Sequence, residues 1–411
     1  MKLDFQAQEN SINHCLIFDP IPFSGGSKTA TREALYQCSS KQVKFTILTA
    51  SKECWSDQKF AEKHSIKLIA FNCPRALQVA STGWLFWLKQ LYYMSQIIWL
   101  LLRTDKIDIA LGASGPGIDM ALYLCRFIYK YQLVQLVHGP VAYSRSIGYC
   151  LVSADILFYL ESSRIDIIQS MTLYYHSRIQ LPIGNELARF NLTCPHYMPF
   201  ENGIGQHNWP TPCEYGEPTA YWAASLLKWK GLDTLVLAGK RLSERVKMKV
   251  HVCYIRPKNI SLELSNAPAN ISGFNWHQQP GNLDEIRSRC NVFISTSKNE
   301  PFGLSVLEAL AAGMCVLIPR DGAYWDRHLT HNLNCIKYKA GSDAALSEAL
   351  YRLILHPRVI PQLGHSALKI ANQYRAETCY QNIASYLNQG TLNQSTLNPN
   401  HRVKLNQVSR R

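Results

Sequence analysis

The sequence has no closely spaced pair of cysteines. Its 13 cysteines are scattered singly along 411 residues, whereas zinc ribbons and thiol redox motifs need two cysteines within a few positions. The amino-terminal residues 1–14 are polar and contain no apolar run like the centre of a secretory leader. Since scattered, odd-numbered cysteines also fit a reducing compartment, we expect free thiols and a cytoplasmic protein, with any membrane contact peripheral and at the inner face.

The sequence also lacks the motifs of common metal and nucleoside triphosphate sites. Its 13 histidines form no H-E-x-x-H motif, and the stretch Gly25-Gly26-Ser27-Lys28 lacks the G-x-x-x-x-G-K-[ST] spacing of a P-loop. We therefore expect no bound metal and no cofactor.

Acidic residues are few, with 29 Asp and Glu against 43 Lys and Arg and a net charge of +14. Such an excess suits a phosphate-rich substrate or an anionic membrane surface. We do not expect a nucleic-acid partner, because no basic helix with interleaved aromatic residues is present. Part of the charge lies in residues 391–411, a polar tail without acidic residues that we expect to be disordered.

Short apolar runs alternate with helical patterns in both halves of the chain, which is typical of parallel sheets covered by helices. We predict two Rossmann-like α/β domains over residues 1–195 and 196–365, and a terminal helix over residues 366–390 that crosses back to the first domain. A linker is expected at about residues 195–218, where no periodicity is sustained. The predicted strands are 15–18, 43–48, 66–71, 107–111, 133–137 and 156–160 in the first half, and 220–224, 250–255, 292–296, 316–319 and 335–338 in the second.

One segment, from Trp84 to Arg103, is almost entirely apolar or aromatic over about five helical turns. Lys89 lies inside it and argues against a transmembrane helix, which needs roughly 20 apolar residues in a row. Two interpretations remain open: a buried core helix, or a helix in a membrane interface with its tryptophans among the lipid headgroups.

The strongest functional signal is the segment NVFISTSKNEPFGLSVLEALAAGMCVLIPRDG over residues 291–322. A buried strand leads into a polar loop that contains Glu300, and Pro301-Phe302-Gly303 opens a helix. Open parallel sheets bind ligands at the carboxyl ends of their strands, and the free N–H groups of a helix amino terminus attract phosphate. Glu308 follows among apolar helix residues, so its carboxylate needs a polar partner.

This segment resembles the donor site of retaining glycosyltransferases of family 4, which have the two-domain GT-B fold with two Rossmann-like domains facing a central cleft. The resemblance rests on Glu300 and Glu308, with Pro-Phe-Gly-Leu between them and Glu-Ala-Leu-Ala-Ala-Gly from Glu308 onwards. It implies that Glu300 contacts the transferred sugar and Glu308 the ribose, while the amides of Phe302, Gly303 and Leu304 face the sugar and the phosphate. On this basis Glu308→Ala should abolish donor binding and leave the fold intact.

A second similarity lies in residues 220–239, where the family places an arginine and, five residues later, a lysine before a glycine, both directed at the diphosphate. Lys230-Gly231 matches the second half of this pattern. The arginine position is occupied by Ser225, and Lys228 is a possible substitute. The departure leaves donor affinity, and even activity, open.

In the first half, Gly25 and Gly26 follow the first strand and resemble the family's glycine-rich loop on the acceptor side, although two glycines before a helix are also an ordinary turn. His138 ends a predicted strand where the family commonly has a histidine facing the donor sugar. Such a histidine can bond a sugar hydroxyl or assist proton movement, and a purely structural histidine is the alternative.

Together these features predict a retaining, metal-independent hexosyltransferase that moves a sugar from a nucleotide-sugar to a glycan or lipid-linked acceptor in surface polysaccharide synthesis. Glu300, His138 and Lys230 are the expected catalytic residues. Two alternatives stay open: a sugar-nucleotide epimerase of the same fold, and a catalytically degenerate member that binds a glycan or a partner protein.

Overall fold

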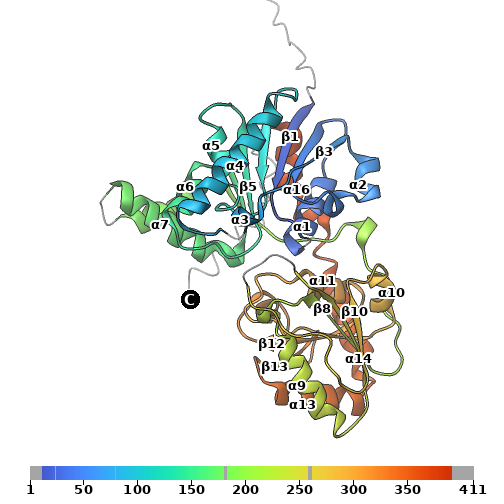
Figure 1. Cartoon of the computed structure of the whole chain (residues 1–411). Coiled ribbons are helices and arrows are strands. Elements are labelled where there is room, and N and C mark those ends of the chain that lie inside the picture. Colours follow the sequence, from blue (N-terminus) through green and yellow to red (C-terminus); the bar gives the residue numbers. More distant parts are fainter. Residues whose placement is uncertain (1–11, 24, 79, 180–182, 258–261, 391–411) are drawn as a thin grey trace, which may run out of the picture. The chain divides into compact units, whose positions relative to one another are not determined.

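The computed structural model describes residues 12–23, 25–78, 80–179, 183–257 and 262–390. The chain divides into a first domain, formed by residues up to 201 together with those from 376 onwards, and a second domain of residues 202–375. Figure 1 shows both as sheets flanked by helices. All strand pairs in both sheets are parallel, so the predicted α/β class with two parallel sheets is confirmed.

The first domain has a seven-stranded sheet in the order β3-β2-β1-β4-β5-β6-β7. The apolar runs of the sequence become its central strands, which are buried on both faces. The strands are β1 (Asn13–Asp19), β2 (Val43–Thr49), β3 (Ile66–Ala70), β4 (Ile109–Gly112), β5 (Gln132–Val137), β6 (Ile156–Leu160) and β7 (Tyr197–Phe200).

Helices of the first domain connect these strands, as parallel pairing requires. They are α1 (Gly26–Tyr36), α2 (Gln58–Lys63), α3 (Arg75–Gln78), α4 (Gly83–Leu101), α5 (Met120–Cys125), α6 (Arg145–Ser153), α7 (Arg164–Ile179) and α8 (Gly184–Asn191), with short 3₁₀ turns η1 (Lys52–Trp55) and η2 (Glu161–Ser163). Two helices from the end of the chain, α15 (Ala376–Cys379) and α16 (Gln381–Gln389), complete the domain.

The second domain has a six-stranded sheet in the order β10-β9-β8-β11-β12-β13. Its strands are β8 (Thr219–Ser225), β9 (Lys249–Ile255), β10 (Phe274–Gln278), β11 (Val292–Ile294), β12 (Cys315–Arg320) and β13 (Ile336–Lys339). Its helices are α9 (Leu232–Ser243), α10 (Leu283–Ser288), α11 (Leu304–Ala311), α12 (Tyr324–His328), α13 (Asp343–Leu355) and α14 (Val359–Ala371), with the 3₁₀ turns η3 (Gln206–Asn208) and η4 (Lys228–Lys230).

Two strands were not predicted, and both lie at an edge of a sheet. β7 falls inside the segment expected to be a linker, and β10 falls in a stretch without a continuous apolar run. An edge strand has a ladder on one side only, so it tolerates Pro199 in β7 and the half-exposed polar residues of β10. The apolar-run criterion misses these two strands, although it finds the edge strands β3 and β13.

The end of the chain is divided among helices. Instead of one helix over 366–390, α14 ends at Ala371 in the second domain, and α15 and α16 belong to the first. Asn13 at the start of β1 donates to the carbonyls of Leu387 and Asn388 at 3.1 and 2.8 Å, and Tyr386 donates to Gln132 at 2.8 Å. These bonds fix α16 to the first sheet. The tail 391–411 lies outside the described residues.

Helix α4, which forms from the apolar segment, is neither wholly buried nor wholly exposed. Gln90, Tyr93, Ile97 and Leu100 are buried in the core of the first domain. The opposite side is open to solvent, although it is equally apolar. Within the described part of the chain, no helix combines the length and the hydropathy that a bilayer crossing requires.

Candidate functional site in the second domain

The first half of the site is the turn that follows β8. This turn contains η4 and Gly231, which has a φ of +73°. A β-carbon at Gly231 would lie 2.1 Å from the carbonyl oxygen of Thr296, so only glycine allows the turn to approach the end of β11. The Thr296 hydroxyl donates to the carbonyl of Lys230 at 2.8 Å and accepts from the indole of Trp222 at 2.9 Å. Lys230 is thereby held at the carboxyl edge of the sheet.

The second half of the site is the loop between β11 and α11, which contains Glu300. Asn299 has a φ of +51°, and its amide donates to Asp321 at 2.9 Å. Gly303, with a φ of +81°, precedes the first residue of α11. These two left-handed residues reverse the chain twice within five positions, which presents Glu300 beside the amino end of the helix.

The two halves meet in an ion pair between Lys230 and Glu300. The Lys230 Nζ lies 2.5 Å from the Glu300 Oε2, and the two side chains are only 19% and 17% exposed. The ammonium of Lys230 also lies 4.1 Å from the centre of the Trp229 ring. The structure thus brings together two residues that the sequence analysis placed in one site from motifs 70 residues apart.

Phe302 anchors the loop between Glu300 and α11. Its ring is 2% exposed and packs against Tyr324, Trp325 and Tyr374, with centroid distances of 4.7, 5.3 and 6.0 Å. The Trp325 indole donates to the carbonyl of Gly303 at 3.2 Å. The aromatic side chains therefore fix the backbone whose amides were expected to face a ligand, and Leu304 begins the helix at this fixed point.

Glu308 pairs with Arg287 of α10, a residue that the sequence analysis did not single out. The Arg287 Nη1 lies 2.9 Å from the Glu308 Oε2, and the side chains are 7% and 30% exposed. Burial alone would lower the pKa of Arg287, but the charge of Glu308 raises it above its ordinary value. The polar partner that Glu308 needs is supplied by the protein, so the expectation that Glu308→Ala leaves the fold intact has to be revised.

Lys228, the possible substitute for the missing arginine, is already engaged. Its Nζ lies 2.7 Å from the Asp233 Oδ2 and 3.9 Å from Glu263. The hydrogen bond to Asp233 raises the pKa of Lys228. Ser225 is the last residue of β8, and it supplies no charge at the arginine position.

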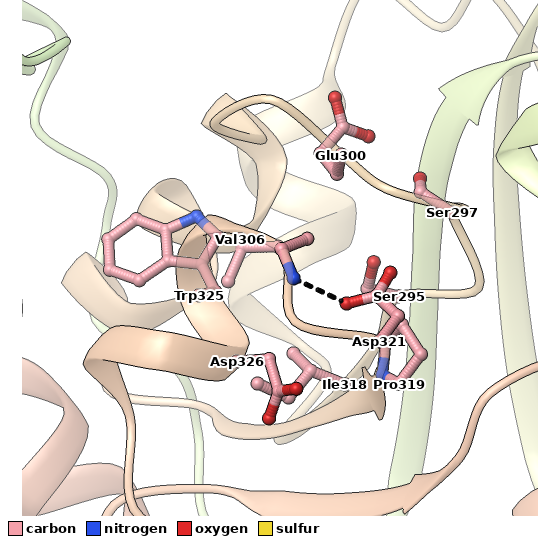
Figure 2. A pocket seen from close by; sticks show the side chains of 10 residues that line it. Ser295, Ser297, Glu300, Val306, Ile318, Pro319, Asp321, Trp325 and Asp326 are labelled. Carbon is pink, nitrogen blue, oxygen red and sulfur yellow. Dashed lines mark hydrogen bonds between the residues drawn. The ribbon is translucent and has the colours of Figure 1, made fainter. Parts of the chain in front are cut away.

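A small pocket opens between the Glu300 loop and the β12–α12 connection. Figure 2 shows Glu300 and Ser297 on one side of it and Asp326 on the other, with the Trp325 indole beside them. Asp326 pairs with Lys337 at 2.8 Å; burial alone would raise the pKa of Asp326, and Lys337 holds it below its ordinary value. The lining residues are Ser295, Ser297, Glu300, Val306, Ile318, Pro319, Asp321, Ala323, Trp325 and Asp326. Its carboxylates and its indole are already bonded within the protein, Glu300 to Lys230, Asp326 to Lys337 and Trp325 to Gly303.

The glycine-rich loop of the first domain leads into α1. Gly25 is the extended residue before the helix, and Gly26 is its first residue. Lys28 does not point to a ligand: its Nζ lies 2.7 Å from the Oδ2 of buried Asp19 and 2.5 Å from the carbonyl of Ile21. Through these two contacts the lysine stabilises the loop.

His138 follows β5 and bonds to α1 through Thr31. The His138 Nε2 lies 2.9 Å from the Thr31 hydroxyl, which itself donates to the carbonyl of Ser27 at 2.8 Å. In the tautomer with a proton on Nε2, the imidazole donates to Thr31 while the Thr31 hydroxyl donates to Ser27. The predicted acceptor-side loop and the predicted histidine are thus connected in one hydrogen-bonded chain.

Residues 210–367, which contain Lys230, Glu300 and Glu308, match the family model of group 1 glycosyl transferases. The second domain is a glycosyltransferase group 1 domain. Within the described residues, this domain and the first contain no group of three or more His, Cys, Asp and Glu side chains that could hold a metal ion.

Curated relatives of the glycosyltransferase domain act on different substrates. The 2-deoxystreptamine N-acetyl-D-glucosaminyltransferase of Niallia circulans is 20% identical over 355 residues, which are 79% of this chain and 86% of that protein. The alpha-maltose-1-phosphate synthase of Mycobacterium tuberculosis is 28% identical over 163 residues, which are 36% of this chain and 42% of that protein. The similarity over both domains is therefore low.

Solved structures share the fold of both domains. Anabaena HepE in complex with UDP-glucose has a TM-score of 0.64 at 16% identity, covering 91% of this chain and 99% of that chain. Sucrose-phosphate synthase from Thermosynechococcus elongatus has a TM-score of 0.66 at 14% identity, covering 92% and 99%. The chain has the GT-B fold, as the resemblance of the donor motif implied.

Proposed function

We propose that the chain is a retaining glycosyltransferase that uses a nucleotide-sugar as its donor. The observation that carries the proposal is the Lys230–Glu300 ion pair at the carboxyl edge of the second sheet, beside the amino end of α11. Anabaena HepE, which has the same fold, was solved with UDP and with UDP-glucose. A nucleoside diphosphate sugar has a phosphate for the lysine and hydroxyls for the glutamate.

The ion pair suggests how donor binding prepares the reaction. A diphosphate placed beside Lys230 takes over the ammonium, and this releases the Glu300 carboxylate to accept hydrogen bonds from the sugar. Negative charge then develops on the phosphate oxygens as the sugar departs, where the lysine and the amides of Phe302, Gly303 and Leu304 stabilise it by several kcal/mol. We propose that this stabilisation needs no metal ion.

In the first domain, we propose that Gly25 and Gly26 face the acceptor and that His138 serves the reaction at the sugar. The His138 Nε2 lies 2.9 Å from the hydroxyl of Thr31 in α1, the helix that Gly25 and Gly26 open, which supports this assignment. The acceptor is proposed to be a glycan or a lipid-linked sugar of a surface polysaccharide, which would place the reaction at the cytoplasmic face of a membrane.

The test is a thermal-shift screen of nucleoside diphosphates and their hexose conjugates, followed by calorimetry with the best ligand. We expect Lys230→Met to weaken binding by about 10- to 100-fold, since a charged hydrogen bond contributes roughly 1.5–3 kcal/mol. Lys228→Met is the matched control, because Lys228 lies in the same turn and is occupied by Asp233. Equal losses in both variants would disprove the role of Lys230.

Product analysis tests the reaction itself. For a retaining transferase, NMR of the product shows the anomeric configuration of the donor, nucleoside diphosphate appears only with an acceptor, and a chelator has no effect. An epimerase would instead convert the nucleotide-sugar without any acceptor.

A degenerate, binding-only member is the second candidate, and one observation favours it. Ser225 brings no charge to the arginine position and Lys228 is held by Asp233, so of the two lysines in this turn Lys230 is the one left for the diphosphate. If the screen finds no nucleotide that stabilises the protein, this second candidate replaces the first.

A further inference from the structure

The outer face of α4 is an unusual surface for a soluble domain. Seven large apolar side chains on this helix and at its end are exposed, and the most exposed are Trp84 at 73% and Leu102 at 72%. They are Trp84, Leu85, Trp87, Leu88, Leu91, Trp99 and Leu102. Single exposed apolar residues are common, but a continuous row of them marks an interaction site.

The row follows the helix axis. Trp84, Leu88, Leu91, Trp99 and Leu102 are four, three, eight and three residues apart, so they share one side of the helix, opposite the side that is buried in the core. From Trp84 to Leu102 the row is about 27 Å long at 1.5 Å per residue. Helices α4 and α5 both belong to the first domain (Figure 1). Phe127 and Ile128, just beyond α5, are also exposed, at 77% and 60%.

The two segments that form this surface contain basic but no acidic residues, and the carboxylates that follow them, Asp105 and Asp155, pair with Lys44 and Arg126. Residues 63–104 contain no Asp or Glu, and neither do residues 120–154. Arg103 is exposed at the end of α4 and stacks over Trp99 at 4.4 Å, and Lys130 is exposed after α5. Lys89 is not part of this set, because its ammonium donates to the carbonyl of Ala80.

We propose that this surface, the outer face of α4 with Phe127 and Ile128, docks onto an anionic lipid bilayer with α4 lying in the headgroup region. Tryptophans suit the interface between headgroups and acyl chains, the leucines enter the acyl boundary, and Arg103 and Lys130 meet lipid phosphates. A second copy of the chain fits less well: a twofold contact would bring two cationic surfaces together without acidic partners.

This inference goes beyond the proposed chemistry, since the docking surface and the Lys230–Glu300 site lie in different domains. The two can therefore fail separately. Nucleotide stabilisation reports on the second domain and vesicle binding reports on the first.

The test is sedimentation of the full chain with vesicles of phosphatidylcholine alone or mixed with phosphatidylglycerol. We expect binding to the mixed vesicles, weaker binding at high salt, and a loss of about tenfold or more in the combined variant Trp84→Ser, Trp87→Ser, Leu91→Ser. The control variant Leu237→Ser, Leu355→Ser replaces leucines of similar exposure in the second domain and should bind like the wild type.

Two outcomes would overturn the proposal. One is vesicle binding by the combined α4 variant that equals that of the wild type. The other is a stable dimer, seen by light scattering, that the α4 variant loses while neither protein binds vesicles. A circular dichroism spectrum and a melting temperature like those of the wild type would show that the first domain of the variant is folded.

Discussion

The ion pair between Arg287 and Glu308 allows a sharp test of how the second domain is stabilised. At 2.9 Å and an effective dielectric constant of about 20, the gross attraction is about 6 kcal/mol, most of which offsets desolvation. Breaking a buried pair by removing one partner costs about 3–5 kcal/mol. Because the Glu308 side chain is 30% exposed and water can solvate it, we expect Arg287→Met to cost about 2–3 kcal/mol, below that range.

For a domain of this size, 1 kcal/mol corresponds to about 2–4 °C in melting temperature, so we expect Arg287→Met to melt roughly 5–10 °C lower. Calorimetry of the full chain measures this, and Arg289→Met is the control, since Arg289 is 65% exposed and pairs with Glu285 on the surface of the same helix. The double variant with Glu308→Gln should be less destabilised than the sum of the single variants. Additive effects of the two substitutions, or equal losses at Arg287 and Arg289, would refute the reasoning.

Two further predictions concern a buried acid and a glycine. Burial raises the pKa of Asp119 from 3.8 to about 8. At pH values between these two, the unfolded chain has released a proton that the folded chain keeps. The free energy of unfolding should therefore fall by about 1.4 kcal/mol per pH unit as the pH rises. Asp119→Asn should flatten this dependence in urea titrations at pH 5 and pH 8. Gly231→Ala should cost about 2 kcal/mol or more and weaken nucleotide binding, because its β-carbon meets the Thr296 carbonyl at 2.1 Å, whereas Gly216→Ala, with open space around it, should do neither.

The central strands of both sheets could be predicted because they are buried on both faces. Each is a run of apolar residues, and the predicted ranges differ from β1, β2, β5 and β8 by only one or two residues at an end. The edge strands β7 and β10 could not be found in this way. Each pairs with the strand that precedes it in the chain, but its own residues carry no sustained apolar signal.

In the site, sequence motifs could predict the residues but not their partners. Glu300 and Lys230 each belong to a local pattern, and the parallel topology brings both patterns to the same sheet edge. Arg287 has no such pattern: it reaches Glu308 only because α10 and α11 pack in the same domain. Trp325 likewise meets Phe302 through the connection after β12, so neither contact could be derived from spacing along the chain.

The four charged groups that were expected to hold the donor all have protein partners. Lys230 pairs with Glu300, Glu308 with Arg287 and Lys228 with Asp233. A ligand that binds here must therefore break an existing ion pair. Only a ligand that has both an anion for Lys230 and hydroxyls for Glu300 can replace the partner that each of these two residues loses. A free sugar would have to compete with the Lys230 ammonium for the Glu300 carboxylate, because these two groups already satisfy each other at 2.5 Å. If the proposed function is correct, donor selection begins with the diphosphate, and the sugar contributes only after Lys230 has been drawn away from Glu300.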